Sequence, residues 1–448
     1  IDRFENPAVQ EVAVIEVVKM WIRNALVSLS VFDDVRFRIE RLTVGVMIAV
    51  ENAVLDVLRF LLFRKTDNRF RRIIVFRAGA LGDFIVALPA LRLLRKQYPG
   101  ARIILLTVPS LHPRWRNRSI VSGGLVLGQH FVDETLFIPG LNRGHWRQLK
   151  HLRNRILELN PDMCIVLPFV GEPLISRMVK MILLRLLGCR KNLYGYHTRS
   201  NLGCFRRIQH KLSMFEHQVV APIMALKELG INCDEVAFEI TISADDVERV
   251  DSWWWQHGLD DDSQLCIAVS PFAKQKLKCW PIENFRELGY SLLSRFPGVR
   301  LVIVGGPEDK LPGDYLEKAW GRKAVNFAGR ASILQSAEII RRCKLFIGND
   351  SGPSHIAAAV EVPVVTIFSS FVFPELWRPW GKRSRIIRHS VPCEFCFAEN
   401  GKCPKGTNVC LDTISVNEVL SHCLAALENQ VPAEDSSMRK NTLCAGPV

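Results

Sequence analysis

The sequence lacks the marks of several large protein classes. No segment repeats at the period of about 20–50 residues that is typical of solenoids, and no zinc-finger pairing, aromatic ribonucleoprotein motif or basic-zipper pattern occurs. The two most apolar segments, 10–30 and 43–63, are interrupted by charged residues that would be costly at the centre of a bilayer. We therefore expect neither segment to cross a membrane. A charged-then-apolar secretory arrangement is also absent.

Acidic residues are in short supply relative to basic ones. The 448 residues contain 45 Asp and Glu against 59 Lys and Arg, which gives a net charge of +14. Such a balance favours anionic partners, namely nucleic acid, an acidic membrane surface or a phosphate-bearing substrate. Because no nucleic-acid motif accompanies the charge, we expect no nucleic-acid partner. The hydrophobic fraction of 48% is ordinary for a globular protein, and the length predicts two or three domains.

The 13 cysteines form an odd number, and most of them stand alone in apolar segments. Together with the absence of a secretory signal, this predicts a reducing, cytoplasmic compartment. Four cysteines are clustered with the spacing C-x2-C-x6-C-x6-C: Cys393, Cys396, Cys403 and Cys410. Four thiols at this spacing are consistent with a structural zinc or iron site, with disulfides or with free thiols.

Residues 1–70 are predicted to be an amphipathic helical extension. Segment 43–63 has the spacing of an apolar helix with one polar stripe, formed by Glu51, Asn52, Asp56 and Arg59, and segment 10–30 has a similar pattern. Such helices either pack on a domain or partner, or lie in a membrane interface. The basic cluster that follows favours anionic lipid: Arg64, Lys65, Arg69, Arg71 and Arg72.

The rest of the chain alternates short β-branched runs with helical patterns, which indicates parallel α/β layers. Two consecutive series of similar length predict two Rossmann-like, doubly wound domains that face a cleft, over residues 71–250 and 262–428. The boundary is expected near 245–263. Residues 429–448 are polar and are predicted to be a flexible tail.

A glycine-rich turn follows the first predicted strand, 73–76. Gly79 and Gly82 allow the backbone to turn sharply at the carboxyl end of a strand, where open α/β sheets bind ligands. Asp83 stands where a helix N-cap is expected. It is therefore either a capping residue or a carboxylate that serves as general base.

A second strand, 345–347, runs into the segment GNDSGPSHIAAA. Asp350 or Ser351 is expected to cap a helix whose first turn holds Gly352, Pro353 and His355. The free N–H groups of such a helix end attract anions, so we predict a diphosphate site here. His355 is either part of this site or a packing residue.

A third set of residues follows the first strand of the second series. Ser270, Lys274 and Lys278 lie near the carboxyl end of that strand, where lysines can neutralise phosphate charge or line a solvated loop. Glu308 follows the turn Gly305-Gly306-Pro307, so it either contacts a ribose or belongs to ordinary turn chemistry. The Asp260-Asp261-Asp262 string is interpreted as a solvated linker and not as a metal site.

Taken together, three segments resemble glycosyltransferase family 9, the ADP-heptose:lipopolysaccharide heptosyltransferases. They are IIVFRAGALGDFIVALPALRLLRKQYPGARI, LKCWPIENFRELG and GNDSGPSHIAAAVEVPVVTIF, and the resemblance extends over roughly 72–425. It implies the GT-B fold and inverting transfer from ADP-L-glycero-D-manno-heptose to a lipopolysaccharide core or another lipid-linked surface glycan. The reaction would need no cofactor.

The resemblance also implies individual roles. Asp83 would deprotonate the acceptor hydroxyl, and Lys278 would balance the charge of the leaving diphosphate. Donor contacts would come from Gly79, Gly82, Ser270, Lys274, Glu308, Asp350, Ser351, Gly352 and His355. Inverting transfer needs such a base and a positive field but no enzyme nucleophile.

The chain departs from the family pattern in two places. Ser369-Ser370 follows the aromatic Phe368, where the family usually has a glycine, and residues 1–70 have no counterpart in the shorter members. The extension leads us to expect a peripheral enzyme on the inner face of the cytoplasmic membrane. The alternative functions are a transferase or epimerase of the same fold with another nucleotide sugar, and a catalytically silent membrane-associated scaffold.

Overall fold

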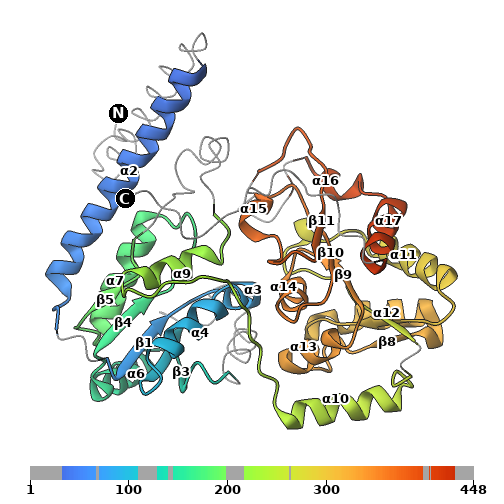
Figure 1. Ribbon diagram of the computed structural model, residues 1–448, viewed down its shortest axis with the longest axis horizontal. Coiled ribbons are helices and arrows are strands. Elements are labelled where there is room, and N and C mark those ends of the chain that lie inside the picture. Colours follow the sequence, from blue (N-terminus) through green and yellow to red (C-terminus); the bar gives the residue numbers. More distant parts are fainter. Residues whose placement is uncertain are drawn as a thin grey trace, which may run out of the picture.

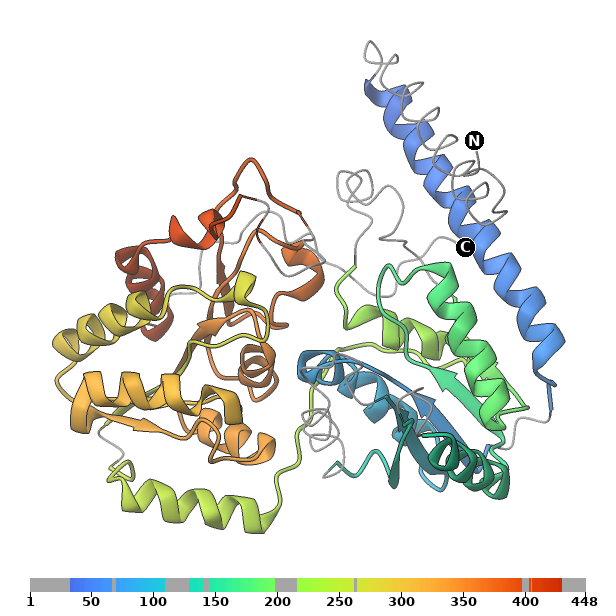
Figure 2. The same cartoon turned by 180° about the vertical axis from the view of Figure 1, so that it is seen from behind.

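The computed structural model describes residues 33–66, 70–108, 129–139, 145–197, 216–261, 264–396, 403 and 405–428. Three predicted features lie outside these ranges: the helix at 10–30, Asp262 of the Asp260-Asp261-Asp262 string, and the tail 429–448. Two α/β domains are present, and a long helix, α2 (Asp33–Leu62), runs along the outer side of the first domain (Figures 1 and 2).

The first domain is built on a parallel sheet with the order β3-β2-β1-β4-β5. Its strands are β1 (Arg72–Phe76), β2 (Arg102–Thr107), β3 (Glu134–Phe137), β4 (Met163–Val166) and β5 (Leu193–Tyr194). The helices are α3 (Leu81–Ile85), α4 (Leu88–Gln97), α6 (Trp146–Leu159), α7 (Leu174–Leu187) and α9 (Val220–Lys227). Ile73 and Val75 of β1 belong to one core, whereas Ile74 and Phe76 belong to another, so helices cover both faces of the sheet.

The second domain repeats this design with the parallel order β11-β10-β9-β6-β7-β8. Its strands are β6 (Leu265–Ser270), β7 (Val299–Ile303), β8 (Ala324–Asn326), β9 (Leu345–Asn349), β10 (Val364–Ile367) and β11 (Ser384–Ile387). Its helices are α11 (Ile282–Arg295), α12 (Lys310–Trp320), α13 (Ile333–Arg341), α14 (Gly352–Ala359), α15 (Pro374–Trp377), α16 (Val409–Asp412) and α17 (Val416–Leu427). The predicted pair of doubly wound α/β domains is therefore confirmed.

The strand orders determine where ligands are expected. The order of each sheet reverses beside its first strand, between β1 and β4 and between β6 and β9. Open α/β sheets bind ligands outside the carboxyl ends of the strands at such switch points. The three motifs follow β1, β6 and β9, so all of them lie at a switch point.

One predicted helix is wrong in extent. The pattern over 84–97 predicts a single helix, but the structure has α3 and then α4, separated by Val86 and Ala87. Pro89 lies in the first turn of α4, and a proline inside a continuous helix would remove one backbone hydrogen bond and clash with the preceding turn. The apolar periodicity continues through Val86 and Ala87, so the sequence pattern did not show that the helix is interrupted there.

The helix α10 (Ala244–Gln256) lies along the second domain and packs on α13 (Figure 2). Trp253 stacks on Phe327 with ring centroids 5.6 Å apart, and Arg342 forms an ion pair with Asp251 at 2.7 Å. We therefore propose that the second domain begins at α10, one residue before the expected boundary region 245–263, and not at residue 262.

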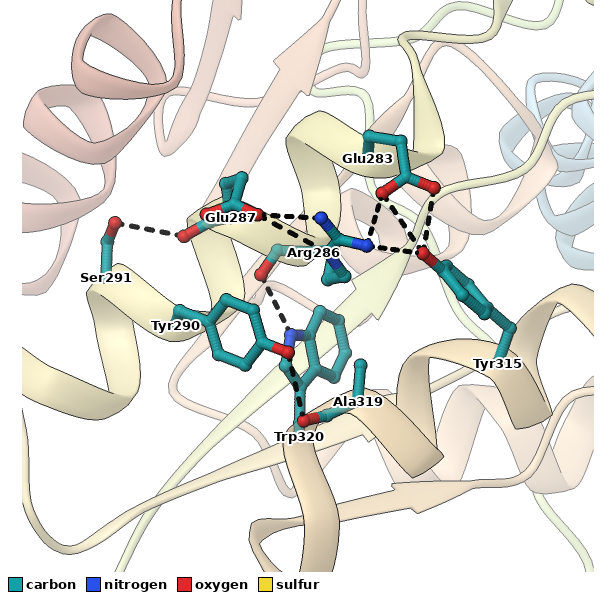
Figure 3. A network of polar contacts seen from close by, with 8 residues as sticks. All are labelled: Glu283, Arg286, Glu287, Tyr290, Ser291, Tyr315, Ala319 and Trp320. Carbon is teal, nitrogen blue, oxygen red and sulfur yellow. Dashed lines mark hydrogen bonds and ion pairs between the residues drawn. The ribbon is translucent and has the colours of Figure 1, made fainter.

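A polar network joins α11 and α12 on the second domain (Figure 3). The Tyr315 hydroxyl accepts a bond from Arg286 at 2.7 Å and donates to Glu283 at 2.8 Å. The Trp320 indole N–H donates to the Arg286 carbonyl at 3.0 Å. A Cβ on Gly289 would lie 2.2 Å from the Trp320 ring, so the glycine allows the two helices to approach closely.

The predicted helix at 43–63 is part of α2. Its polar stripe faces the first domain, because Arg177 of α7 forms an ion pair with Glu51, and Tyr196 donates a hydrogen bond to Asp56 at 2.7 Å. Among the described residues, we find no helix that is both long and apolar enough to span a membrane.

Candidate active site

The loop after β1 holds Asp83 in a closed turn. Asp83 is the third residue of α3 and not its N-cap, which is Ala80. Its carboxylate accepts a hydrogen bond from the Ala80 backbone N–H at 2.5 Å. A Cβ on Gly79, which has a φ of 138°, would lie 2.5 Å from the Asp83 side chain. Asp83 therefore does cap the helix, but from its third position and not from the N-cap. The turn itself depends on the glycine at position 79.

Arg77 fixes this turn to the neighbouring strand. Its guanidinium is buried and donates to the Asp83 carbonyl at 2.9 Å and to the carbonyls of Leu167 and Pro168 at 2.9 and 2.8 Å. It also stacks over the Phe169 ring at 3.8 Å. Burial lowers the Arg77 pKa to about 10, so the side chain still carries a positive charge at neutral pH.

The surroundings of Asp83 combine burial with positive charge. Burial raises the Asp83 carboxyl pKa above its ordinary value, whereas Arg77, Lys278 and Lys274 oppose that rise. Two of these cations belong to the second domain. The base candidate of one domain therefore lies within electrostatic reach of the lysines of the other.

Lys278 and Asp350 form an ion pair in the second domain. The Lys278 Nζ lies 2.6 Å from Asp350 Oδ2, and the carboxylate is only 3% exposed. Lys278 ends a short 3-10 turn (Lys276–Lys278), and Asp350 directly follows β9. The neighbouring Asn349 holds these segments together, because it accepts from the Trp280 N–H at 3.0 Å and donates to the Pro271 carbonyl at 2.8 Å.

The N-terminus of α14 follows this pair. Ser351 is the N-cap and Pro353 lies in the first turn, as predicted. The hydroxyls of Ser270 and Ser351 are buried and have no hydrogen-bond partner among the described residues. Buried hydroxyls without partners are costly, and a ligand oxygen is one way to satisfy them.

The two domains meet where α3 and α14 touch. A Cβ on Gly352 would lie 2.8 Å from the Leu81 side chain, and one on Gly82 would lie 3.3 Å from the His355 ring. The predicted residues Gly82, Asp83, Gly352 and His355 are therefore brought to one interdomain junction, with Lys278 and Asp350 beside it.

His355 and His217 are both neutral at this junction. Burial lowers the His355 pKa to about 4 and the His217 pKa to about 3. The Nδ1 of His217 accepts from the Val219 N–H at 3.1 Å, so its Nε2 donates to the Arg378 carbonyl at 2.7 Å. His217 thereby links the chain after β5 to the second domain.

Two residues that were predicted to bind the donor are exposed to solvent. Lys274 and Glu308 are exposed, at the carboxyl ends of β6 and β7 respectively. Both lie beyond the carboxyl ends of their strands, and their contact with the donor stays a prediction. Asp260 and Asp261 are exposed and precede β6.

Sequence reasoning missed Arg77, His217 and Asn349. Arg77 and Asn349 stand inside segments that were considered, but their partners are backbone groups, which leave no sequence pattern. His217 is separated from Arg378 by more than half of the second domain. Only the fold brings such residues together.

The four clustered cysteines line one small pocket together with Leu277 and Ser370. All four are free thiols. Burial, reinforced by the other three thiols, raises the pKa of Cys410. Among the described side chains, no group of three or more His, Cys, Asp or Glu has an arrangement that holds a metal ion.

The cysteine segment supports the lysine turn. Asn408 donates to the Lys276 carbonyl at 3.0 Å, and Phe395 donates its N–H to the Ser370 carbonyl at 2.7 Å. The Ser370 hydroxyl donates to the His389 carbonyl. Ser370, one of the two serines that depart from the family pattern, therefore holds the cysteine segment and the segment around His389 in place.

Comparison with known proteins identifies the family. Residues 182–405 match the model of glycosyltransferase family 9 (heptosyltransferase). Lipopolysaccharide heptosyltransferase 3 of Escherichia coli is 26% identical over 314 residues, which cover 67% of this chain and 83% of the relative.

Solved structures share the fold. The E. coli ADP-heptose lipopolysaccharide heptosyltransferase II has a TM-score of 0.57 at 20% identity and covers 80% of this chain and 98% of its own. The family 9 glycosyltransferase of Veillonella parvula has a TM-score of 0.62 at 20% identity, with coverages of 82% and 99%. These likenesses confirm the predicted GT-B fold. The chain is therefore a glycosyltransferase that belongs to family 9, the heptosyltransferases.

Proposed function

We propose that this enzyme transfers heptose from ADP-L-glycero-D-manno-heptose to a lipopolysaccharide core or another lipid-linked glycan, with inversion at the anomeric carbon. The main support for this function is the junction of α3 and α14, where Asp83 lies within electrostatic reach of the Lys278–Asp350 pair. The names of the relatives, lipopolysaccharide heptosyltransferase 3 and ADP-heptose heptosyltransferase II, support this donor and acceptor.

Asp83 acts as the general base in this proposal. Its carboxylate takes the proton from an acceptor hydroxyl, the oxygen attacks the anomeric carbon, and the bond from that carbon to the diphosphate breaks, so that ADP leaves. Burial makes the carboxylate a stronger base than an exposed aspartate, and the nearby cations oppose the rise of its pKa. One displacement of this kind inverts the configuration.

The second domain holds the donor in this proposal. Lys278 and the α14 N-terminus stabilise the charge that grows on the leaving diphosphate, since both provide positive potential before the reaction begins. Ser270 and Ser351 offer their buried hydroxyls, and neutral His355 offers a ring N–H without adding charge. Gly79, Gly82 and Gly352 allow close backbone approach, while Lys274 and Glu308 complete the rim.

Donor binding tests the nucleotide sugar. Isothermal titration calorimetry with ADP-heptose, and with UDP-N-acetylglucosamine as the rival, should show binding of ADP-heptose only. Binding of the uridine donor alone would assign the site to another nucleotide sugar. Absence of binding by any nucleotide sugar would favour a silent scaffold.

Asp83→Asn tests the base. General-base catalysis contributes typically about 10²–10⁴-fold, so turnover should fall by that factor. Donor affinity should stay nearly constant, because the donor lies on the other domain. Turnover above about a tenth of the wild-type rate would remove Asp83 from this role.

We further propose that the four-thiol pocket takes a structural zinc or iron ion once its cysteines deprotonate. Thiolates are the required ligands, and four thiols line this pocket. They would have to move closer together than in the structure, where the described side chains hold no metal-binding arrangement. No catalytic step uses this ion. Metal analysis of protein purified without chelator should give about one ion per chain; recovery of none would leave free thiols.

A further inference from the structure

The helix α2 is attached to the first domain through its polar stripe and through Leu55, Leu58 and Leu62, which pack in the core. Arg177, which is only 2% exposed, forms an ion pair with Glu51 and donates to Asn52 at 3.3 Å. Asp56 accepts from Tyr196, and His197 contacts the same carboxylate at 3.1 Å. An ordinary surface helix buries its apolar face and shows its polar face to water. This helix buries apolar residues against the domain, with Leu55 0% exposed in the core, and also carries an apolar side that faces away from it.

The opposite side of α2 is apolar and exposed over five turns. We call it the outer face, and its members are Leu42, Val46, Val50, Val54, Val57, Phe60 and Leu61. They recur every three or four residues and so share one side of the helix. Phe60 is 83% exposed and Leu61 is 71% exposed. Contiguous exposed apolar surface of this kind marks an interaction site.

The neighbouring helix α7 carries a second apolar row. Ile175, Val179, Ile182 and Leu186 follow the same three-or-four spacing and are all exposed, with Ile175 at 74%. The inner side of α7 packs on α2 and on the sheet. Two adjacent helices of one domain therefore both present apolar rows outward.

Cations lie at the ends of the outer face. Arg41 precedes it, and Arg64 and Lys65 follow it, all three exposed. Between Arg41 and Arg64 the charged residues Glu51, Asp56 and Arg59 contact the first domain, since Arg59 lies over the Tyr196 ring at 5.9 Å. An apolar stripe with basic ends is complementary to a bilayer surface of anionic lipid. A second copy would bring like charges together at these ends.

We propose that the outer face of α2 and the exposed row of α7 dock the enzyme on an anionic bilayer. The helix lies in the interface, with its apolar side chains among the acyl chains and its basic ends at the headgroups. The proposal rests on the proposed function in one respect: docking would bring the enzyme to a lipid-linked acceptor. The binding itself is measured without donor or acceptor.

Co-sedimentation of the full-length protein with vesicles of phosphatidylglycerol and phosphatidylcholine tests the proposal. The variant Val50→Ser/Val57→Ser/Phe60→Ser should lower the partition coefficient at least about ten-fold, because three buried apolar side chains are lost. The matched control is Leu311→Ser/Trp255→Ser, which changes residues that are 79% and 73% exposed in the second domain. It should bind vesicles as the wild type does.

The charge arm uses Arg64→Glu/Lys65→Glu, which should weaken binding to anionic vesicles and reduce its dependence on salt. Circular dichroism and donor affinity should be unchanged in all variants, since the altered side chains are exposed. Equal vesicle binding by the wild type and the α2 variant would overturn the proposal. So would a wild-type dimer that the α2 variant abolishes, or vesicle binding that appears only after deletion of residues 1–32. If the wild-type protein binds vesicles but transfers no heptose, the proposed function fails and the docking proposal stands.

Discussion

At the residue scale, the Lys278–Asp350 pair changes how a lysine substitution must be interpreted. Asp350 is buried, so Lys278→Ala leaves a carboxylate without its partner in addition to removing a charge from the donor site. Loss of one member of a buried pair typically costs about 3 kcal/mol or more. A fall in activity after this single change therefore has two causes.

The double variant Lys278→Ala/Asp350→Asn separates them. We expect Lys278→Ala to lower both the melting temperature and the donor affinity. The double variant should recover much of the stability, because no charge is stranded, but it should not recover turnover. Thermal unfolding and steady-state kinetics check this prediction. Recovery of turnover in the double variant would show that Lys278 serves the fold alone.

Asp83 should govern the acid side of the pH–rate profile. Its pKa is raised by burial, so the carboxylate protonates at a higher pH than an exposed aspartate, and turnover falls as the pH drops through that value. Lys274 lowers the same pKa. Lys274→Gln should therefore move the acid limb to higher pH. Lys276→Gln is the matched control, since this exposed lysine is not among the groups that influence Asp83, and it should leave the limb in place.

At the element scale, the contact between α11 and α12 depends on one glycine. Gly289→Ala would place a Cβ 2.2 Å from the rigid Trp320 ring, and such overpacking typically costs about 1–3 kcal/mol. Alanine is the better helix former by up to about 1 kcal/mol, so the net change should still be destabilising. Urea unfolding measures it. Gly298→Ala, where a Cβ meets nothing within 4 Å, should change the stability by less than about 0.5 kcal/mol.

The same scale shows what the sequence allowed us to predict. The alternation of strand and helix patterns was recognisable along both domains, because the apolar periodicity of helices such as α6, α7 and α11 is strong. The strands β5, β8 and β11 were missed, since none of them carries a long apolar run. The polar stripe of α2 was recognised, but its direction was not, because the pattern of one helix does not state which side meets the protein.

At the scale of the whole molecule, the candidate site exists only where the domains meet. The motif residues were predicted from their spacing, and their convergence follows from the switch points of two sheets. The backbone partners of Arg77 and the link from His217 to Arg378 were not predictable, since they depend on how the domains are placed.

Gly352→Ala tests that placement. The added methyl would press on Leu81 at 2.8 Å and push α14 away from α3. Misplacement of reacting groups by about 1 Å costs up to about 100-fold in rate, so the catalytic constant should fall by roughly ten-fold or more. Adding Leu81→Ala should restore part of the lost rate by making room for the methyl. A double variant as slow as the single one would mean that the contact is not what aligns the domains.

The polar and apolar contacts of α2 have a consequence for truncated forms of the first domain. Removal of the helix would leave the buried Arg177 without its carboxylate, uncover Tyr196 and strip Leu58 and Leu62 from the core that they pack against. A protein that starts at Arg71 would thus carry an unpaired charge beside newly exposed apolar surface. We therefore expect a stable first domain to require the part of α2 that makes these contacts, although the family motifs begin only at β1.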